Sequence, residues 1–221
     1  MTAVWPWLAI AGLGVYHGID PSMGWLFAVA LGMQEHSRAK VVAALGPIAI
    51  GHMIAIGGVV ALIGWARMTA ASGIVRPVGA AILIAFGLFR YLRPGAHPRW
   101  VSMRVNWHQL MLWSFLMATA HGAGLMLFPI VMDMPGSATA GGHHGLHGRL
   151  MHAAMGVGSL TVTEGILVVA VHVGTMVLVM GTIAVLVYDR FGLAFLRRAW
   201  INLDTIWAGA LIAAGILSLV V

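Results

Sequence analysis

The sequence predicts an all-α polytopic membrane protein with six transmembrane helices. Of its 221 residues, 61% are hydrophobic and only 8% are charged, and a single water-soluble globule cannot bury that much apolar surface. The apolar residues gather in long segments with most of the charged residues in the gaps between them, and each segment reaches the ~20 residues that a bilayer requires. The segments are 4–33, 41–65, 74–92, 107–134, 157–188 and 201–221.

The first segment is too long for one straight span. About thirty residues at a rise of ~1.5 Å would reach ~45 Å, against a hydrocarbon core of ~30 Å. Pro21 lies inside this segment and has no N–H to donate to the carbonyl of His17, and its ring pushes that carbonyl aside. The sequence therefore predicts that the first helix is kinked or broken near Pro21.

Basic residues lie unequally on the two sides that six alternating spans define. One side collects Arg38, Lys40, Arg90, Arg93, Arg99, Arg104, Arg190, Arg197 and Arg198, and the other collects Arg67, Arg76 and Arg149. Because short cytoplasmic loops carry the excess of Arg and Lys, the richer side is predicted to face the cytoplasm. Both termini and the segment 135–152 would then be outside, in a bacterial-type inner (plasma) membrane. Glu164 and Asp204 are candidate ion-pair partners for Arg76 or another basic residue.

The two halves of the chain resemble one another. His17-Gly18 in the first segment has a counterpart in His121-Gly122 in the fourth, and the second and fifth segments each carry one histidine, His52 and His172. The third and sixth segments share a similar apolar stretch, at 83–87 and 211–215. With three helices in each half, the second copy must enter the membrane from the opposite side. We therefore expect one membrane domain of two inverted three-helix repeats, 1–105 and 106–221, with a site at the midplane between them.

Four histidines and one aspartate lie inside apolar segments rather than at their ends, and ionisable residues at membrane depth are functional by default. They are His17, Asp20, His52, His121 and His172. Imidazole is a common ligand of nickel, cobalt, zinc and copper ions, and a carboxylate adds a ligand or balances charge, so these residues form the predicted metal site. On a helix, spacings of three and four bring His17 near Asp20 and His172 near Met176.

Each of these residues also has a purely structural interpretation. A histidine in a membrane helix can hydrogen-bond a neighbouring helix, and Asp20 can cap a helix that restarts after the break. Methionines near the histidines more often pack than ligate, although their thioethers leave copper(I) open as the metal. These methionines are Met23, Met53, Met126 and Met176.

The predicted outer segment 135–152 is rich in glycine and carries imidazoles of its own. Its histidines are His143, His144, His147 and His152. A glycine-rich loop loses much conformational entropy when it ligates an ion. We therefore expect secondary, weak capture of metal outside the membrane and not a transport site.

Two short motifs resemble a known family. The residues His17-Gly18-Ile19-Asp20-Pro21 and Gly51-His52 are similar to the first-helix His-x-x-Asp-Pro-type signature and the following Gly-His motif of nickel and cobalt permeases in the lysine-exporter-like superfamily. The resemblance implies inverted helical halves, transport of a transition-metal cation, and a site that includes His17, Asp20 and His52. The chain departs from the family at Ser22, Met23 and Gly24, where a second histidine usually follows the aspartate.

Two other classes of function remain open from the sequence. Histidines on different helices can ligate haem, and His108 and His121, thirteen residues apart in the fourth segment, have the spacing of ligands that serve two stacked haems. The chain can also be an accessory subunit of a larger membrane complex, in which the histidines join helices. Its possible partners are other membrane subunits or further copies of itself. We expect the chain to have no enzymatic activity, because the sequence contains no recognisable set of a nucleophile, a base and an orienting acid. We expect no nucleic-acid partner, because the basic residues form no run.

Overall fold

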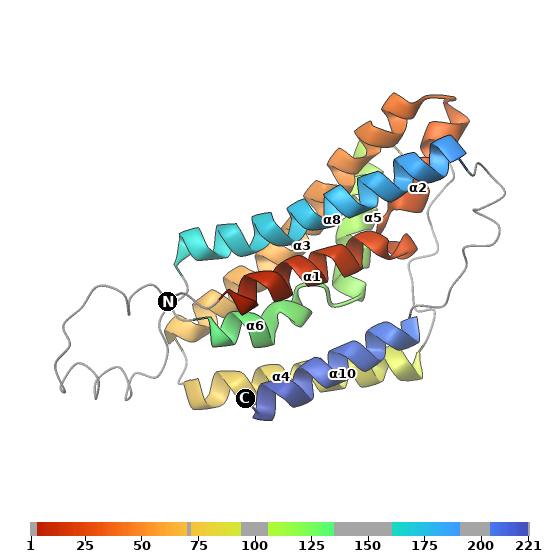
Figure 1. Cartoon of the computed structure of the whole chain (residues 1–221). Helices are drawn as coiled ribbons and strands as arrows, with labels where there is room; N and C mark the ends of the chain where they lie inside the picture. The colour runs from red at the N-terminus through yellow and green to blue at the C-terminus, as the bar shows by residue number, and fades with distance from the viewer. Residues whose placement is uncertain (1–3, 70–71, 94–105, 135–160, 191–203, 221) are drawn as a thin grey trace.

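The computed structural model describes residues 4–69, 72–93, 106–134, 161–190 and 204–220, and all regular structure in these ranges is helical (Figure 1). The predicted all-α class is therefore confirmed for the described residues. The helices are α1 (Trp5–Ile19), α2 (Trp25–Gln34), α3 (Arg38–Thr69), α4 (Ser72–Leu92), α5 (Trp107–Ala120), α6 (Phe128–Asp133), α8 (Val162–Arg190) and α10 (Asp204–Val220). Two short 3-10 helices, η1 (Pro21–Met23) and η2 (Leu125–Leu127), interrupt the chain between α1 and α2 and between α5 and α6.

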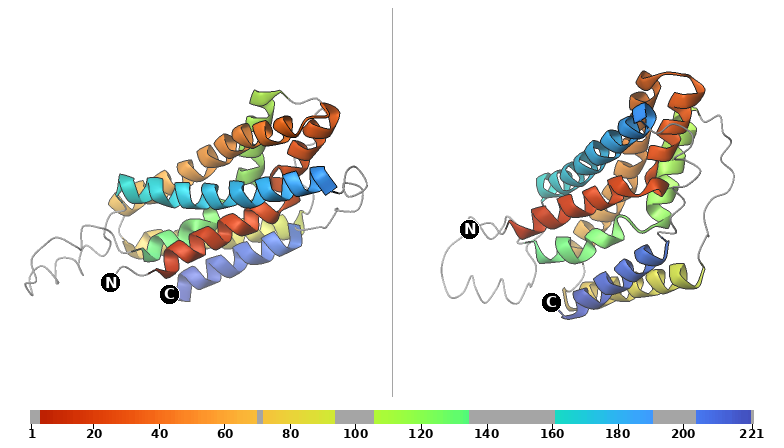
Figure 2. Two further views of the ribbon diagram at one scale, coloured as in Figure 1. Left: turned by 45° about the horizontal axis from the view of Figure 1, so that its top comes forward. Right: turned by 45° about the vertical axis from the view of Figure 1, so that its right-hand side comes forward.

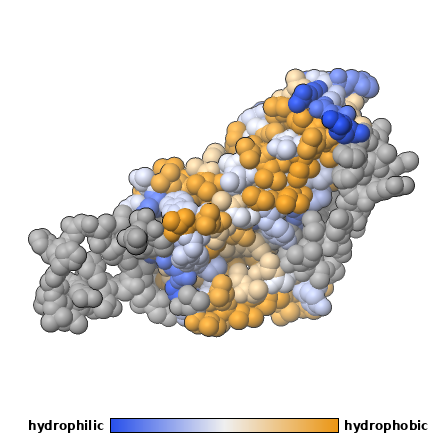
Figure 3. Space-filling view, viewed as in Figure 1, coloured by the Kyte–Doolittle hydropathy of each residue, from blue (hydrophilic) through white to orange (hydrophobic). Residues whose placement is uncertain are grey.

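Several helices are compatible with a membrane-embedded protein. Three are individually long and apolar enough to cross a bilayer: Arg38–Arg67, Ile74–Leu92 and Val162–Arg190. A fourth span is present if α5 and Leu125–Asp133 are taken together, although they are bent by 47°. Apolar side chains cover much of the visible helical surface (Figure 3), and Leu178 on α8 is 71% exposed. Such a surface is unfavourable in water and compatible with lipid.

The predicted break in the first segment is confirmed. Helix α1 ends at Ile19, Asp20 is extended with ψ of 119°, and η1 follows with Pro21 at its first position. Gly24 then adopts a φ of +130°, a conformation that side chains with a Cβ rarely tolerate, and α2 starts at Trp25. The chain breaks fully here, because Pro21 supplies no N–H to continue α1 and Gly24 allows it to turn.

The fourth segment is also broken, which the sequence had not predicted. Helix α5 ends at Ala120, and His121 is its C-terminal cap. Gly122 follows with a φ of +69°, the left-handed conformation that often ends a helix. The chain continues through η2 into the short helix α6. Each of the two breaks therefore lies next to a His-Gly pair.

Three helix pairs make the most extensive contacts: α1 with α8, α3 with α5, and α4 with α10. Glycines permit the close approach of the helices in all three pairs. A Cβ added to Gly18 of α1 would lie 2.7 Å from the carbonyl oxygen of Met176 in α8. A Cβ on Gly87 of α4 would lie 3.0 Å from the carbonyl oxygen of Ala208, so α4 and α10 run side by side (Figure 2). Small residues at such positions are typical of helix packing in lipid.

Ion pairs lie at both ends of the bundle. The left end of the bundle in Figure 1 is where α1, α4 and α8 begin. Helices α3, α6 and α10 end there. At this end Arg76 of α4 forms an ion pair of 2.7 Å with Asp133 of α6, and not with Glu164 as the sequence analysis had considered. Glu164 instead caps α8 by accepting hydrogen bonds from the backbone N–H and hydroxyl of Thr161. At the opposite end Arg38 approaches Asp189 at 3.8 Å on the surface.

Candidate metal centre

Three of the predicted ligands meet in the interior of the bundle. His17 comes from the last turn of α1, His52 from the middle of α3 and His172 from α8, and all three are fully buried. The ring centroids lie 5.3 Å apart for His17 and His52, 4.9 Å for His17 and His172, and 5.7 Å for His52 and His172. One ligand nitrogen from each ring falls within 4.8 Å of the other two. We call these residues the histidine trio.

The backbone orients two of the three rings. Nδ1 of His17 lies 2.7 Å from the carbonyl oxygen of Leu13, one turn earlier on α1, and Nδ1 of His172 lies 3.3 Å from that of Ile10. A carbonyl only accepts hydrogen bonds, so each Nδ1 carries the proton and donates it. In a neutral imidazole the other nitrogen, Nε2, then keeps its lone pair. This arrangement is common in metal sites, where a hydrogen bond at one nitrogen sets the tautomer of the ligand.

Several nitrogens of the trio have no protein partner. Among the described residues, the two nitrogens of His52 and the Nε2 of His172 form no hydrogen bond, although all three atoms are buried. A buried polar atom without a partner costs ~1–3 kcal/mol. Hydrogen bonding between helices therefore accounts for the contact of His172 with Ile10 but does not explain the burial of His52.

The spacing of the trio is close to that of a coordinated ion. Metal–nitrogen bonds of ~2 Å place three ligands around one ion ~3.5 Å from one another. The nitrogens lie within 4.8 Å, so small rotations of the rings would complete such a site. The geometry of the trio is therefore compatible with a single metal ion.

Asp20, a predicted ligand, lies outside the trio. The expected three-residue spacing from His17 does not apply, because α1 ends at Ile19 and Asp20 is no longer helical. Its buried carboxylate caps η1: Oδ1 accepts hydrogen bonds from the backbone N–H of Ser22 at 2.8 Å and from the Ser22 hydroxyl at 2.7 Å. The capping role considered from the sequence is therefore present in the structure.

His121, the fourth predicted histidine, lies beside the trio but does not join it. Its Nδ1 lies 2.8 Å from the carbonyl oxygen of Met117, which repeats the arrangement of His17 with Leu13. Its Nε2 lies 3.4 Å from the hydroxyl oxygen of Ser22. Ser22 thus lies between the carboxylate of Asp20, at the first break, and His121 at the second. The contacts of Ser22 were not predicted, although Asp-Pro-Ser is a recognisable capping pattern in the sequence.

Four of the remaining predicted residues lie outside the described part of the chain: His143, His144, His147 and His152. His108 is exposed in the first turn of α5, whereas His121 is buried beyond its last turn, so the two occupy different environments.

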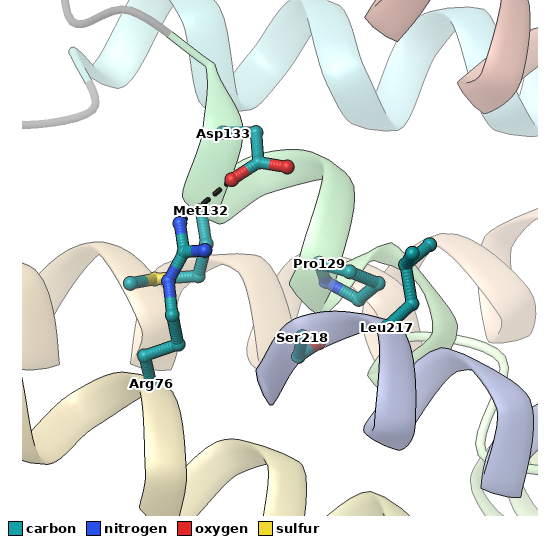
Figure 4. Close-up of a pocket in the computed structure, with 6 residues that line it drawn as sticks. All are labelled: Arg76, Pro129, Met132, Asp133, Leu217 and Ser218. Atoms are coloured by element: carbon teal, nitrogen blue, oxygen red, sulfur yellow. Dashed lines mark hydrogen bonds and ion pairs between the residues drawn. The ribbon is translucent and has the colours of Figure 1, made fainter. Parts of the chain in front are cut away.

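A small pocket at one end of the bundle contains no cluster of possible metal ligands (Figure 4). It is lined by Arg76, Pro129, Met132, Asp133, Leu217 and Ser218. The ion pair of Arg76 with Asp133 crosses it, and nearby Arg67 donates a hydrogen bond to the carbonyl oxygen of Val131. These groups hold α6 against α3 and α4. We call Arg67, Arg76 and Asp133 the α6 clamp.

Comparison with known proteins gives no assignment: no family model, no curated protein and no solved structure matches the chain.

Proposed function

We propose that the protein carries a transition-metal cation across a lipid membrane and binds it at the histidine trio. The observation that carries this proposal is the convergence of His17, His52 and His172 from three helices. Within the described part of the chain, both nitrogens of His52 and the Nε2 of His172 have no hydrogen-bond partner. Lone pairs that converge in an apolar interior stabilise a cation and contribute little to the fold otherwise. The resemblance to nickel and cobalt permeases at the His17 and Gly51-His52 motifs points to the same class of cargo.

We further propose six spans arranged as two inverted repeats, 1–105 and 106–221. In such an arrangement the first helix of each half packs on the second helix of the other, and α1 with α8 and α3 with α5 are such pairs. The third helices would pack on each other reciprocally. In support, a Cβ on Gly87 would lie 3.0 Å from the carbonyl oxygen of Ala208, and one on Gly215 would lie 3.0 Å from that of Ala80.

The location of the trio suits this design. His17 and His52 belong to the first half and His172 to the second, so relative motion of the halves would change access to the ion while its ligands stay near the midplane. The breaks beside His17 and His121 supply irregular backbone where membrane proteins tolerate it, next to a site buried in protein. The cargo would exchange hydration water for imidazole nitrogens on entry.

The proposed orientation has both termini and 135–152 outside a bacterial-type inner membrane. It follows the excess of basic residues on the other side, which includes Arg38, Lys40 and Arg190 at one end of the described bundle. The histidines of 135–152 would then collect metal ahead of the trio. A thiol label at a cysteine introduced at Ser137 reports the side directly, and protection of that cysteine in intact cells would reverse the orientation.

Metal flux into proteoliposomes tests the transport function. Purified full-length protein is reconstituted, and uptake of Ni²⁺, Co²⁺, Zn²⁺ and, under reducing conditions, Cu⁺ is followed by elemental analysis. We expect uptake of at least one metal, its loss in His52→Ala, and normal uptake in the control His108→Ala, which changes an exposed histidine. Equal flux in empty liposomes, or full flux in His52→Ala, would rule the proposal out.

A further inference from the structure

The three rings of the trio are held in different ways. Nδ1 of His17 and Nδ1 of His172 both donate to backbone carbonyls of α1, those of Leu13 and Ile10. Among the described residues, neither nitrogen of His52 forms a hydrogen bond. Rotation of the imidazole of His17 or His172 therefore breaks a hydrogen bond, whereas rotation of His52 breaks none.

The contact between α1 and α8 fixes His17 and His172 relative to each other. Gly14 and Gly18 lie one turn apart on the side of α1 that faces α8. A Cβ on Gly14 would lie 2.5 Å from the carbonyl oxygen of His172 itself, and Gly18 makes the same kind of contact one turn later. The two backbones therefore pack directly on each other, and this brings the ring of His172 to a carbonyl of α1.

His52 is held at a different contact. Its neighbour Gly51 packs against α5, where an added Cβ would meet the carbonyl oxygen of Met111. The hydroxyl of Ser114, on α5, donates to the carbonyl oxygen of Ile48, one turn before His52, at 2.7 Å. These contacts hold the α3 backbone on α5. The position of His52 therefore depends on α5, while the other two rings depend on the contact of α1 with α8.

The difference matters because the site has to close around an ion. The ligand nitrogens lie within 4.8 Å of one another and three ligands of one ion lie ~3.5 Å apart, so at least one ring must turn inward. His52 can turn without losing a hydrogen bond, and ligation would give one of its buried nitrogens a partner. A ligand that is not oriented beforehand also loses more freedom on binding. His52 is therefore the ring that can join and leave the ion at the least cost.

We infer that His17 and His172 form a fixed pair that retains the ion, and that His52 is the exchangeable ligand that closes and opens the site. The inference rests on the proposed transport function and assigns its release step to one residue. When the bond from His52 to the ion breaks, its nitrogen keeps the lone pair and a water molecule takes the vacant coordination position. A carrier requires such a step, because its site must release the ion as well as bind it.

Metal binding to three single variants tests the inference. Zn²⁺, Ni²⁺ and, in parallel, Ag⁺ are titrated into purified full-length protein, and the binding that remains in a variant without all three trio histidines is subtracted. Because an orienting hydrogen bond on a ligand is worth ~10–100-fold in affinity, His17→Ala and His172→Ala should each weaken binding at least about tenfold more than His52→Ala. A loss at His52 that equals or exceeds the loss at either other position would overturn the inference and leave a metal site intact. Wild type that binds none of the three ions would defeat the proposed function itself.

Asparagine variants keep the test decisive if the alanine variants do not fold. The side-chain amide of asparagine places an N–H near the position of Nδ1, so His17→Asn and His172→Asn can keep the bond to α1 while they remove Nε2. His52→Asn is the matched variant, and His108→Asn is the control at an exposed position. We expect the same order of losses in the trio and no change at His108. Equal losses in the three trio variants would contradict the inference.

Release kinetics test the role of His52 in closing the site. Protein loaded with the ion that wild type binds most tightly is mixed with excess chelator, and the released metal is followed over time. If His52 closes the site after capture, His52→Ala should capture the ion at an unchanged rate and release it at least about tenfold faster. Slower capture with release at the wild-type rate would contradict the inference.

Discussion

The histidine trio and the α6 clamp both bring polar groups into an apolar bundle, but they satisfy them differently. In the clamp, Arg76 is 2.7 Å from the carboxylate of Asp133, and Arg67 donates to the carbonyl oxygen of Val131 at 2.6 Å. In the trio, both nitrogens of His52 have no partner among the described residues. Matched donors and acceptors stabilise a fold, whereas converging unmatched lone pairs reduce its stability. The difference separates residues that hold the helices from residues suited to bind a ligand.

The largest expected effect is on the clamp. Arg67→Met would remove the hydrogen bond to Val131 and leave a buried carbonyl of α6 without that donor, so the free energy of unfolding should fall by about 3 kcal/mol. Thermal unfolding in detergent measures the loss. Arg38→Met, at an exposed pair 3.8 Å from Asp189, is the control and should change stability by less than about 1 kcal/mol. Equal losses in the two variants would remove the distinction between clamp and surface.

Substitutions in the trio should weaken metal binding and change stability little. His52→Ala should weaken metal binding by at least about tenfold, because one of three ligands is lost. Its stability without metal should change little, since the cost of a new cavity is offset by removal of two unpartnered nitrogens. Metal titration and thermal unfolding of the same sample separate the two effects. A large loss of stability with unchanged binding would make His52 a packing residue.

A substitution at the contact of α1 with α8 should lower both the stability of the protein and its affinity for metal. Gly18→Ala places a Cβ 2.7 Å from the carbonyl oxygen of Met176, so α1 must move away from α8, and His17 from His172. We expect about 1–3 kcal/mol of destabilisation together with weaker metal binding. Gly12→Ala on the same helix has nothing within 4 Å of the added Cβ and should be neutral or stabilising. Binding that is preserved in Gly18→Ala would show that the trio does not depend on this helix contact.

The smallest expected effect is at Asp20. Asp20→Asn keeps an oxygen that can accept from Ser22, so η1 should remain capped and metal binding should fall by less than about tenfold. Isothermal titration of this variant beside His52→Ala ranks the two positions. A loss as large as that of His52→Ala would return Asp20 to the ligand set.

The sequence predicted the features that have local causes. The break at Pro21 was predictable because proline lacks an N–H and Asp20 precedes it as a cap. The break at Gly122 was not, because a glycine in a membrane helix is common and only its φ of +69° shows that the chain turns there. The membership of the trio depends on both breaks. The breaks move Asp20 and His121 out of the regular helices. Their positions inside apolar segments therefore could not show that they lie outside the trio, whereas His17 belongs to it.

The second break also explains why the ion pair at the end of the bundle was not predicted. Arg76 pairs with Asp133, which belongs to the short helix after the second break, and this break moves the chain across the end of α4. A continuous fourth helix would not suggest that contact. By contrast, the pairing of α4 with α10 rests on Gly87 and Gly215, which already matched between the two halves of the sequence.

X-ray absorption by the bound metal tests the central claim most directly, because it reports the ligands of the ion itself. The full-length protein is loaded with the ion that it binds most tightly, and wild type is compared with His52→Ala. The histidine trio predicts a shell of imidazole nitrogens at ~2 Å in wild type, with about one nitrogen fewer in the variant. An oxygen-dominated shell, or a nitrogen shell that is identical in both proteins, would contradict metal binding at the trio.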